Sequence, residues 1–506
     1  EWVGAVGEIN AGAEATAEAL AHLVLPTGGR IRIGAQQIET IPESIVGRRI
    51  AYVGPDTYLR NTTLRETLLH GLMNYPHRPA KNAERHDRYV TEAHASGNTE
   101  LDIAADWIDY DRVGVTDAAG IDAQILDVLA IVDLADDIFE FGLRSSPDTT
   151  DGSEFQARVL EARVALAAKL KAASISQLVE PFDPSTYQAQ ATIAENLVFG
   201  AALDAAFKPD RLATNKLVLE ILAERGLDQQ LFEVGRRIAA TVVELFADLP
   251  PDHPYFDRLS FVQPDEIPIY KLMLTRLGDR DLAAAQEADR SRLLGLALGY
   301  IEPRHRLNLL SDDIRASVVD ARARMIERIS ANQPDAVAFY EPERYNAGSS
   351  IEANILFGRV THGIADAATR VRQASRETLD ELGLRDIVIA AGLGFVAGPG
   401  GKRLTQAQRQ KISLARALLK QPDLLVVNRG LGSLSARHQR AIMLAVSNYA
   451  RPEGKPNRFA VFWVLASPTL VDMFDRVLVF HDGHVTADGE PAKLLESSRH
   501  LQRLVA

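Results

Sequence analysis

The feature that most restricts the fold of this chain lies at its beginning: an apolar segment, a glycine turn and a helix-forming segment in direct succession. Residues 2–6 fit a short buried strand, and residues 13–25 are rich in alanine and leucine, which favour helix. This order is typical of a loop whose backbone N–H groups cradle phosphate. We therefore expect an α/β domain with a phosphate-binding loop made of Gly7, Glu8, Ile9, Asn10, Ala11, Gly12, Ala13, Glu14 and Ala15.

Two positions in this loop lack the side chains that hold a nucleotide. In a working loop, a lysine follows the second glycine and binds the β- and γ-phosphates, and the next hydroxyl holds Mg²⁺. Here those positions are Ala13 and Glu14. Because a helix N-terminus attracts anions, we expect the Glu14 carboxylate to fold back onto the N–H groups of the loop. The alternative is that Gly7 and Gly12 are ordinary turn glycines.

A second informative segment begins about 400 residues later, where Leu404, Thr405, Gln406, Ala407 and Gln408 lead into a predicted helix over 409–420 and an apolar strand over 424–427. This order resembles the ATP-binding domain of an ABC transporter, in which a Leu-Ser-Gly-Gly-Gln signature opens the helix. Gln406 and Ala407 replace the two glycines, and Thr405 keeps a hydroxyl.

Further segments extend the resemblance to ABC ATPases. Residues 30–34 and 48–53 look like the family's antiparallel β segment, which ends in the Q-loop, and Pro55 takes the place of the Q-loop glutamine. Residues 475–489 resemble the closing β-hairpin of these domains.

The strand over 424–427 is followed in the family by an aspartate that binds Mg²⁺ and a glutamate that acts as general base. Those positions hold Asn428 and Arg429, and Ala466 replaces the switch histidine. An arginine stays protonated and cannot be a general base. The resemblance therefore implies a core without intact catalytic residues, the replaced positions being Ala13, Glu14, Pro55, Asn428, Arg429 and Ala466.

A segment that resembles the opening of the family's helical subdomain occurs three times, and in each copy a tyrosine and a glycine have the same spacing. Each copy has a matching helical block downstream. The copies are 58–71, 187–200 and 345–358, and the blocks are 134–142, 227–235 and 384–392. Chance similarity of short amphipathic helices is the alternative.

We accordingly predict an α/β fold: a P-loop NTPase core of the ABC type, with a mixed sheet, a large α-helical insertion and the family's N-terminal strands missing. The core would comprise residues 1–75 and 341–506, and the insertion 76–340. The insertion resembles, more loosely, that of a bacterial subgroup with expanded ATP-binding domains. Its helices are predicted over 156–173, 236–247 and 312–329, and turns such as 249–254 separate them.

Composition excludes several classes of protein. The formal charge of −12 argues against nucleic-acid binding, and the lack of cysteine excludes disulfides. No apolar run reaches the roughly 18–20 residues of a membrane helix. The histidines lack ligand spacing and we expect no metal site. Four carboxylates within 100–109 could share one face of a helix, which is typical of a solvated face.

The resemblance implies ATP and Mg²⁺ as cofactors, bound weakly or not at all here. It implies a membrane-domain subunit or upstream transmembrane helices and a second ABC ATP-binding domain as partners, at the cytoplasmic face of the inner membrane. We expect a non-hydrolysing structural or regulatory domain in transmembrane transport. The alternatives are a conventional ATP-hydrolysing transporter domain and a protein-interaction module unrelated to transport.

Overall fold

The computed structural model describes residues 1–80, 82–147, 153–246 and 262–506, so the predicted turn over 249–254 lies outside the described residues. Its contacts divide the chain into two compact units. Unit 1 combines Glu1–Gly142 with Asp386–Ala506, and unit 2 is Leu143–Arg385.

This division differs from the predicted insertion limits of 76 and 340 for a packing reason. The α5 helix, Ala118–Ile131, packs on the α19 helix, Gln406–Leu419, and so belongs to unit 1. The α16 helix, Ile351–Leu356, packs instead on α7, Glu154–Ala172, inside unit 2.

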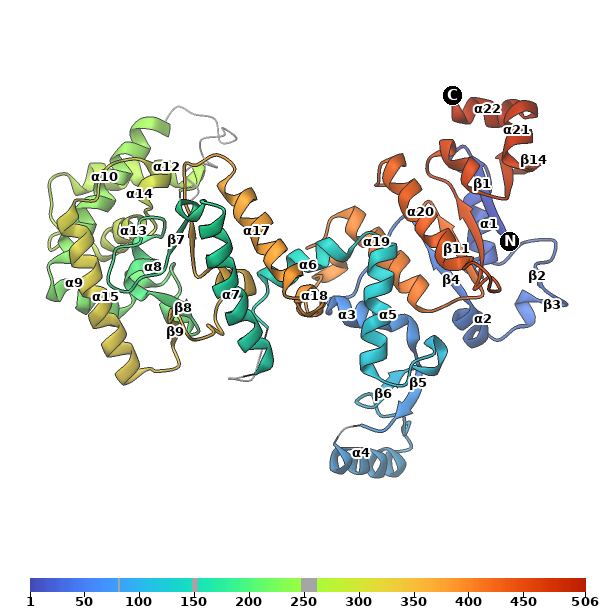
Figure 1. The fold of residues 1–506 in the computed structure, drawn as a ribbon, viewed down its shortest axis with the longest axis horizontal. Helices are drawn as coiled ribbons and strands as arrows, with labels where there is room; N and C mark the ends of the chain where they lie inside the picture. The colour runs from blue at the N-terminus through green and yellow to red at the C-terminus, as the bar shows by residue number, and fades with distance from the viewer. Residues whose placement is uncertain (81, 148–152, 247–261) are drawn as a thin grey trace. The chain divides into compact units, whose positions relative to one another are not determined.

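Unit 1 is built on a six-stranded mixed sheet in which the first and last parts of the chain lie side by side (Figure 1). The strand order is β14-β13-β1-β12-β11-β4. Five strands are parallel and β14 pairs antiparallel to β13. The mixed sheet of the predicted α/β fold and the closing hairpin are confirmed. The strands are β1 (Trp2–Gly7), β4 (Ile50–Val53), β11 (Leu424–Asn428), β12 (Ala460–Val464), β13 (Arg476–His481) and β14 (His484–Gly489).

Residues 30–34 and 48–53, which resemble the family's antiparallel β segment in sequence, belong to two different sheets. β4 pairs parallel to β11 in the main sheet, and β2 (Arg32–Ile33) pairs only with β3 (Gln36–Gln37). The α2 helix, Glu43–Arg49, separates the two segments and leads directly into β4.

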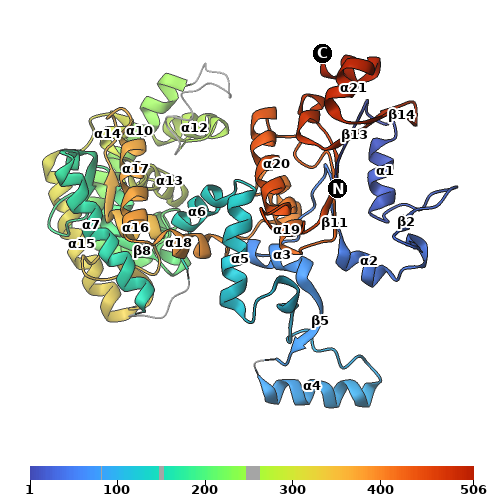
Figure 2. The same ribbon diagram turned by 45° about the vertical axis from the view of Figure 1, so that its right-hand side comes forward.

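Helices complete unit 1. The α1 helix ends at Leu20, short of the predicted residue 25, because His22 turns the chain with a positive φ of 59°. A separate two-stranded pair, β5 (Met73–Arg78) and β6 (Asp106–Ile108), leads to α4, which stands away from the sheet in both views (Figures 1 and 2). The remaining helices in or reaching into this unit are α1 (Ala13–Leu20), α3 (Leu64–Leu69), α4 (Ala83–Ser96), α6 (Ala135–Arg144), α18 (Arg385–Gly392), α20 (Ala436–Ala450), α21 (Pro491–Ser497) and α22 (Arg499–Val505).

Unit 2 is almost entirely helical and contains two of the three repeated segments. Each repeat consists of a long helix, a short strand, a short helix and a second short strand. The first repeat is α7, β7 (Val179–Pro181), α8 (Ile193–Val198) and β8 (Gly200–Ala202), and the second is α15 (Asp312–Asn332), β9 (Val337–Phe339), α16 and β10 (Gly358–Val360). Further helices are α9 (Lys216–Glu224), α10 (Leu227–Phe246), α12 (Ile267–Leu277), α13 (Glu287–Leu298), α14 (Glu302–His305) and α17 (Ala367–Glu381).

The two repeats of unit 2 pair with each other through their short strands and through one buried arginine each. β7 pairs with β10, and β8 pairs with β9. Arg163 in α7 donates from Nε to the carbonyl oxygen of Asn354 in α16 at 2.7 Å. Arg322 in α15 makes the same bond to Asn196 in α8, also at 2.7 Å.

The arginine environments match in detail, which indicates an internal duplication. The two asparagines are 158 positions apart in the sequence. The guanidinium of Arg163 lies 4.3 Å from the ring centre of Phe357, and that of Arg322 lies 4.5 Å from Phe199. Burial lowers the pKa of both arginines to about 10.

The short helices of all three repeats begin in the same way. The side chains of Thr63, Thr192 and Ser350 accept the N–H of the residue three positions later, at α3, α8 and α16. This cap satisfies a backbone donor that the first turn of a helix leaves unpaired. The sequence repeat therefore corresponds to a structural one.

Across the four described ranges, we find no helix with both the length and the apolar character that crossing a bilayer requires.

Candidate functional site

The glycine loop joins β1 to α1 at the carboxyl edge of the sheet. Ala11 donates its N–H to the carbonyl oxygen of Glu8 at 3.1 Å, and its own carbonyl oxygen accepts from Gly483 at 3.0 Å. Gly12 has a φ of 110°, which side chains rarely tolerate. A Cβ at Gly7 would lie 2.9 Å from the carbonyl oxygen of Phe480, so the loop packs tightly on the β13–β14 turn.

Arg429 reaches this loop from the end of β11. Its Nε donates to Oε1 of Glu14 at 2.7 Å, and its Nη2 donates to the carbonyl oxygen of Gly7 at 3.2 Å. The side chains of Arg429 and Glu14 are only 21% and 20% exposed. The guanidinium therefore lies against the glycine loop and neutralises its carboxylate.

The expectation that Glu14 folds back onto the N–H groups of the loop is wrong. Within the described residues, no side chain caps α1. A charge-assisted bond to a guanidinium is stronger than bonds to neutral amides, and Arg429 brings that partner within reach. No local sequence pattern predicts this pairing, because the two residues are 415 positions apart.

Asn428 precedes Arg429 and is tied to the neighbouring strand β4. Its Nδ2 donates to the hydroxyl of Tyr52 at 3.0 Å. Its Oδ1 is buried and has no hydrogen-bond partner among the described residues. Burial raises the pKa of Tyr52, so this pair supplies no group that ionises near neutral pH.

Pro55 and Ala466 lie near the same edge of the sheet. The carbonyl oxygen of Pro55 accepts from Nε2 of Gln410 at 3.2 Å, and Oε1 of Gln410 accepts from the N–H of Ser433 at 3.1 Å. Ala466 follows β12 and offers only a methyl group, which would lie 3.5 Å from a Cβ at Gly432.

The signature-like segment is bonded within unit 1. The Thr405 hydroxyl accepts from the N–H of Gln408 at 3.2 Å and caps α19. The Gln408 side chain accepts from the N–H of Thr405 at 3.0 Å and donates to Asp137 at 2.8 Å. Leu404 is buried, whereas Gln406 is exposed and Ala407 is half-buried. The side chains of Thr405 and Gln408 thus both have intramolecular hydrogen-bond partners.

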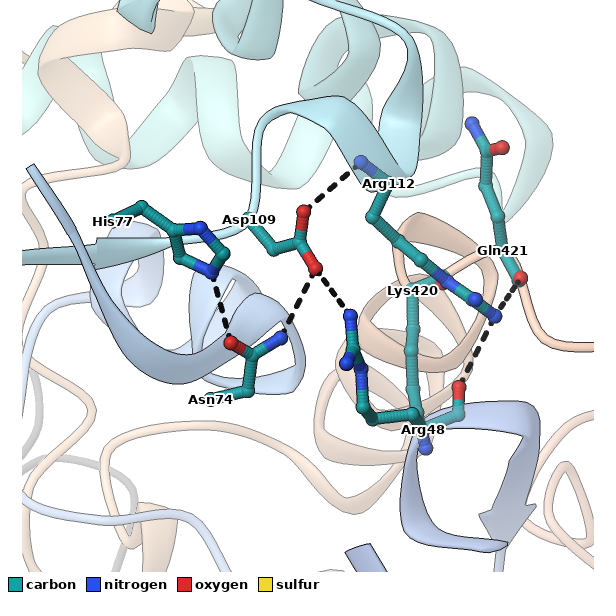
Figure 3. Close-up of polar contacts among 7 residues, drawn as sticks. All are labelled: Arg48, Asn74, His77, Asp109, Arg112, Lys420 and Gln421. Carbon is teal, nitrogen blue, oxygen red and sulfur yellow. Dashed lines mark hydrogen bonds and ion pairs between the residues drawn. The ribbon is translucent and has the colours of Figure 1, made fainter. Parts of the chain in front are cut away.

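A polar network at the base of the β5–β6 pair was missed from the sequence (Figure 3). Oδ2 of Asp109 accepts from Arg48 at 2.7 Å and from Asn74 at 3.0 Å. Burial raises the pKa of Asp109, but the bonds to Asn74 and the Arg112 N–H outweigh it and the net shift is downward.

The interpretation of residues 100–109 as one solvated helix face is wrong. Asp102 and Asp109 are buried, and Asp106 lies in strand β6. Asp102 accepts from Nδ1 of His86 at 3.0 Å and from the N–H of Ala104 at 2.8 Å. The spacing of carboxylates in the sequence is the same for a solvated helix face and for a turn that buried carboxylates stabilise through hydrogen bonds. It therefore does not distinguish the two.

The structure brings four of the replaced positions together. Ala13 and Glu14 follow β1, and Asn428 and Arg429 end or follow β11. One carboxylate already paired with a guanidinium and one neutral amide do not fit a magnesium ion, which prefers several free oxygen ligands and water.

Comparison with known proteins agrees with the architecture. No protein-family model matches the sequence. The ATP-dependent lipid A-core flippase of Chromobacterium violaceum is 29% identical over 169 residues, which is 33% of this chain and 26% of that protein. The mycobactin import ATP-binding/permease protein IrtB of Mycobacterium tuberculosis H37Rv is 30% identical over 206 residues, or 41% of this chain and 32% of that protein.

The matched part of each relative is limited. The chain spans about a third of the length of these relatives. A solved ATP-binding cassette with ADP and Pi bound is 19% identical, covering 26% of this chain and 50% of that chain, with a TM-score of 0.17. The sequence matches and the mixed sheet with its glycine loop together show that the chain contains an ABC-type nucleotide-binding domain.

Proposed function

We propose that this chain is a non-hydrolysing nucleotide-binding domain that acts as a structural or regulatory partner in ABC-type membrane transport. The contact between Arg429 and Glu14 carries the proposal. It places an internal ion pair where a phosphate would meet the loop, and Arg429 also bonds the carbonyl oxygen of Gly7.

Electrostatics supports weak binding of Mg²⁺-ATP. A triphosphate would have to displace Arg429 from Glu14, and an unpaired Glu14 carboxylate would then face the phosphates. Two like charges in direct contact in a partly buried site repel each other by on the order of a few kcal/mol. Ala13 offers no ammonium in exchange.

The relative IrtB is an ATP-binding/permease protein, and by analogy the proposed partner of this chain is a membrane domain at the cytoplasmic face of a membrane. One surface of unit 1 fits such a partner. Tyr58 of the first repeat is 73% exposed, whereas Tyr345 of the third is 6% exposed. Unit 2 covers its own repeats with the long helices α7 and α15.

The first repeat also lacks the asparagine to which the arginines of α7 and α15 donate hydrogen bonds. Thr67 stands where the other repeats have Asn196 and Asn354, and its hydroxyl donates to the carbonyl oxygen of Thr63 at 2.9 Å. We propose that a helix of the membrane domain lies against this face. A Tyr58→Ala variant should keep its thermal stability and lose co-purification with that domain, and unchanged co-purification would argue against this docking face.

Titration calorimetry with Mg²⁺-ATP tests the nucleotide part of the proposal. The native chain should bind with a Kd above about 1 mM, weaker than about 4 kcal/mol. An Ala13→Lys/Glu14→Ser variant restores a lysine and a hydroxyl and frees Arg429, so its affinity should rise at least about tenfold, or 1.4 kcal/mol.

The matched control is Glu18→Ser, which removes a carboxylate from the same helix one turn later. It should leave the affinity unchanged. Micromolar binding by the native chain, or an equal gain in the control, would contradict the role given to Glu14.

A further inference from the structure

A second pocket lies at the opposite edge of the main sheet from the glycine loop. It has a volume of about 510 Å³, and its lining includes Asp423 and Phe459. These residues immediately precede β11 and β12, so the pocket lies at the amino ends of strands whose carboxyl ends face the loop. It is therefore separate from the nucleotide site.

Positive charge dominates the lining of this pocket. Arg112, Lys455 and Arg458 line it against one carboxylate, Asp423. The Asp423 carboxylate already accepts from Arg49 at 2.7 Å. The side chains of Lys455 and Arg458 make no ion pair with any residue in the described ranges, so their charges remain uncompensated.

Arg112, which lines the pocket, is fixed by hydrogen bonds to backbone carbonyl groups (Figure 3). Its Nη2 donates to the carbonyl oxygens of Gln421 at 2.9 Å and Arg48 at 3.2 Å, and its Nε donates to that of Lys420 at 3.3 Å. Neutral carbonyl groups fix the guanidinium without cancelling its charge. Burial, followed by the charges of Arg112 and Arg416, lowers the pKa of the neighbouring Lys420 to about 8.

The rest of the lining is aromatic and apolar. Tyr449, Phe459 and two prolines contribute to it, and the guanidinium of Arg458 lies 4.3 Å from the centre of the Tyr449 ring. The Tyr449 and Phe459 rings are 6.2 Å apart. Apolar walls with a few converging polar groups, at a volume of a few hundred Å³, are typical of small-molecule sites.

We propose that this pocket binds a small organic anion, with its phosphate or carboxylate between Lys455, Arg458 and Arg112 and its apolar part against Tyr449 and Phe459. Two uncompensated cations supply the attraction, and Arg112 supplies a preorganised third donor. Charge-assisted bonds from arginine to phosphate or carboxylate are among the stronger polar contacts in proteins.

Titration calorimetry of the full chain with phenyl phosphate tests the site, with benzoate, inorganic phosphate and phenol as parallel probes. Phenyl phosphate should bind, benzoate or inorganic phosphate more weakly, and phenol not measurably. A Lys455→Ala/Arg458→Ala variant should lose at least tenfold in affinity for phenyl phosphate.

The matched control is Lys402→Ala/Arg437→Ala, which removes two exposed cations elsewhere in unit 1. It should retain native affinity. Three results would each overturn the proposal: no binding of either aromatic anion by the native chain, equal loss in both double variants, or phenol binding as tightly as phenyl phosphate. An Arg429→Ala variant should keep phenyl phosphate affinity, and loss of binding there would instead assign the anion to the glycine loop.

Discussion

Nε of Arg429 donates to Oε1 of Glu14 at 2.7 Å and joins the end of β11 to the first turn of α1. Each residue alone would place an uncompensated charge in a partly buried loop. Together they form an ion pair that stabilises the loop in the absence of a nucleotide. The positive charge of Arg429 and the negative charge of Glu14 thus neutralise each other.

This complementarity predicts a non-additive effect on stability. Arg429→Ala should lower the free energy of unfolding of unit 1 by about 1–3 kcal/mol, because it leaves a partly buried carboxylate unpaired. Glu14→Gln in the same chain should recover most of that loss. Urea unfolding of the two single variants and the double variant measures the coupling. Simple additivity would show that the pair has no mutual role.

The two buried arginines of unit 2 should contribute equally to its free energy of unfolding. Arg163→Leu and Arg322→Leu each leave several carbonyl oxygens and an asparagine without their partner, so each should cost about 3–5 kcal/mol. Lysine should not rescue either site, since its single ammonium cannot bridge several acceptors as a guanidinium does.

Arg328→Leu is the control for the arginine prediction, because Arg328 lies on α15 and makes partly exposed ion pairs with Glu220 and Glu224. It should cost less than about 1 kcal/mol. Thermal unfolding of the variants measures these differences. A large difference between Arg163→Leu and Arg322→Leu would argue against equivalent repeats.

A close helix contact in unit 2 should depend on one glycine. A Cβ at Gly235 of α10 would overlap the carbonyl oxygen of Leu293 in α13. Gly235→Ala should therefore destabilise unit 2 by about 1–3 kcal/mol through overpacking. Gly295→Ala, on the facing helix α13 and with open space around it, should be stabilising by about 0.5–1 kcal/mol. Equal effects of the two substitutions in chemical denaturation would show that α10 and α13 do not pack closely at Gly235.

Unit 2 should lose stability in mild acid because of His305. Burial, followed by the charge of Arg304, lowers the pKa of this histidine to about 4, whereas an unfolded histidine has a pKa of about 6.5. Below about pH 6.5 the unfolded chain binds a proton that the folded chain excludes, so the free energy of unfolding falls as the pH decreases toward 4.

His305→Asn keeps an acceptor for the N–H of Ile301, which bonds Nδ1 at 3.0 Å, and removes the titration. The decline in melting temperature between pH 6.5 and 4 should be shallower in this variant than in the native chain. An identical slope would assign the acid sensitivity to other groups.

Local patterns predicted the parts of the fold that depend on neighbouring residues. The strand, glycine turn and helix at residues 2–20 follow from apolar runs and helix propensity, and the three repeats follow from their fixed spacing. These signals are patterns within short segments of the sequence, so no knowledge of contacts between distant segments was needed.

Long-range pairings could not be predicted in this way. The parallel placement of β4 beside β11 and the exchange of strands between the repeats of unit 2 depend on tertiary packing. From the sequence, the charges at Glu14 and Arg429 were each interpreted as the replacement of a residue that the ABC family uses. Their pairing could be predicted only from the order of strands in the sheet. That order places β1 and β11 on either side of β12.

The most direct test of the central claim is steady-state ATP turnover by the purified chain in the presence of Mg²⁺. Without a general base at Arg429 or a lysine at Ala13, the native chain should release no phosphate above the background of a heat-denatured sample. Steady turnover by the native chain that is abolished by Asn428→Ala would contradict the account.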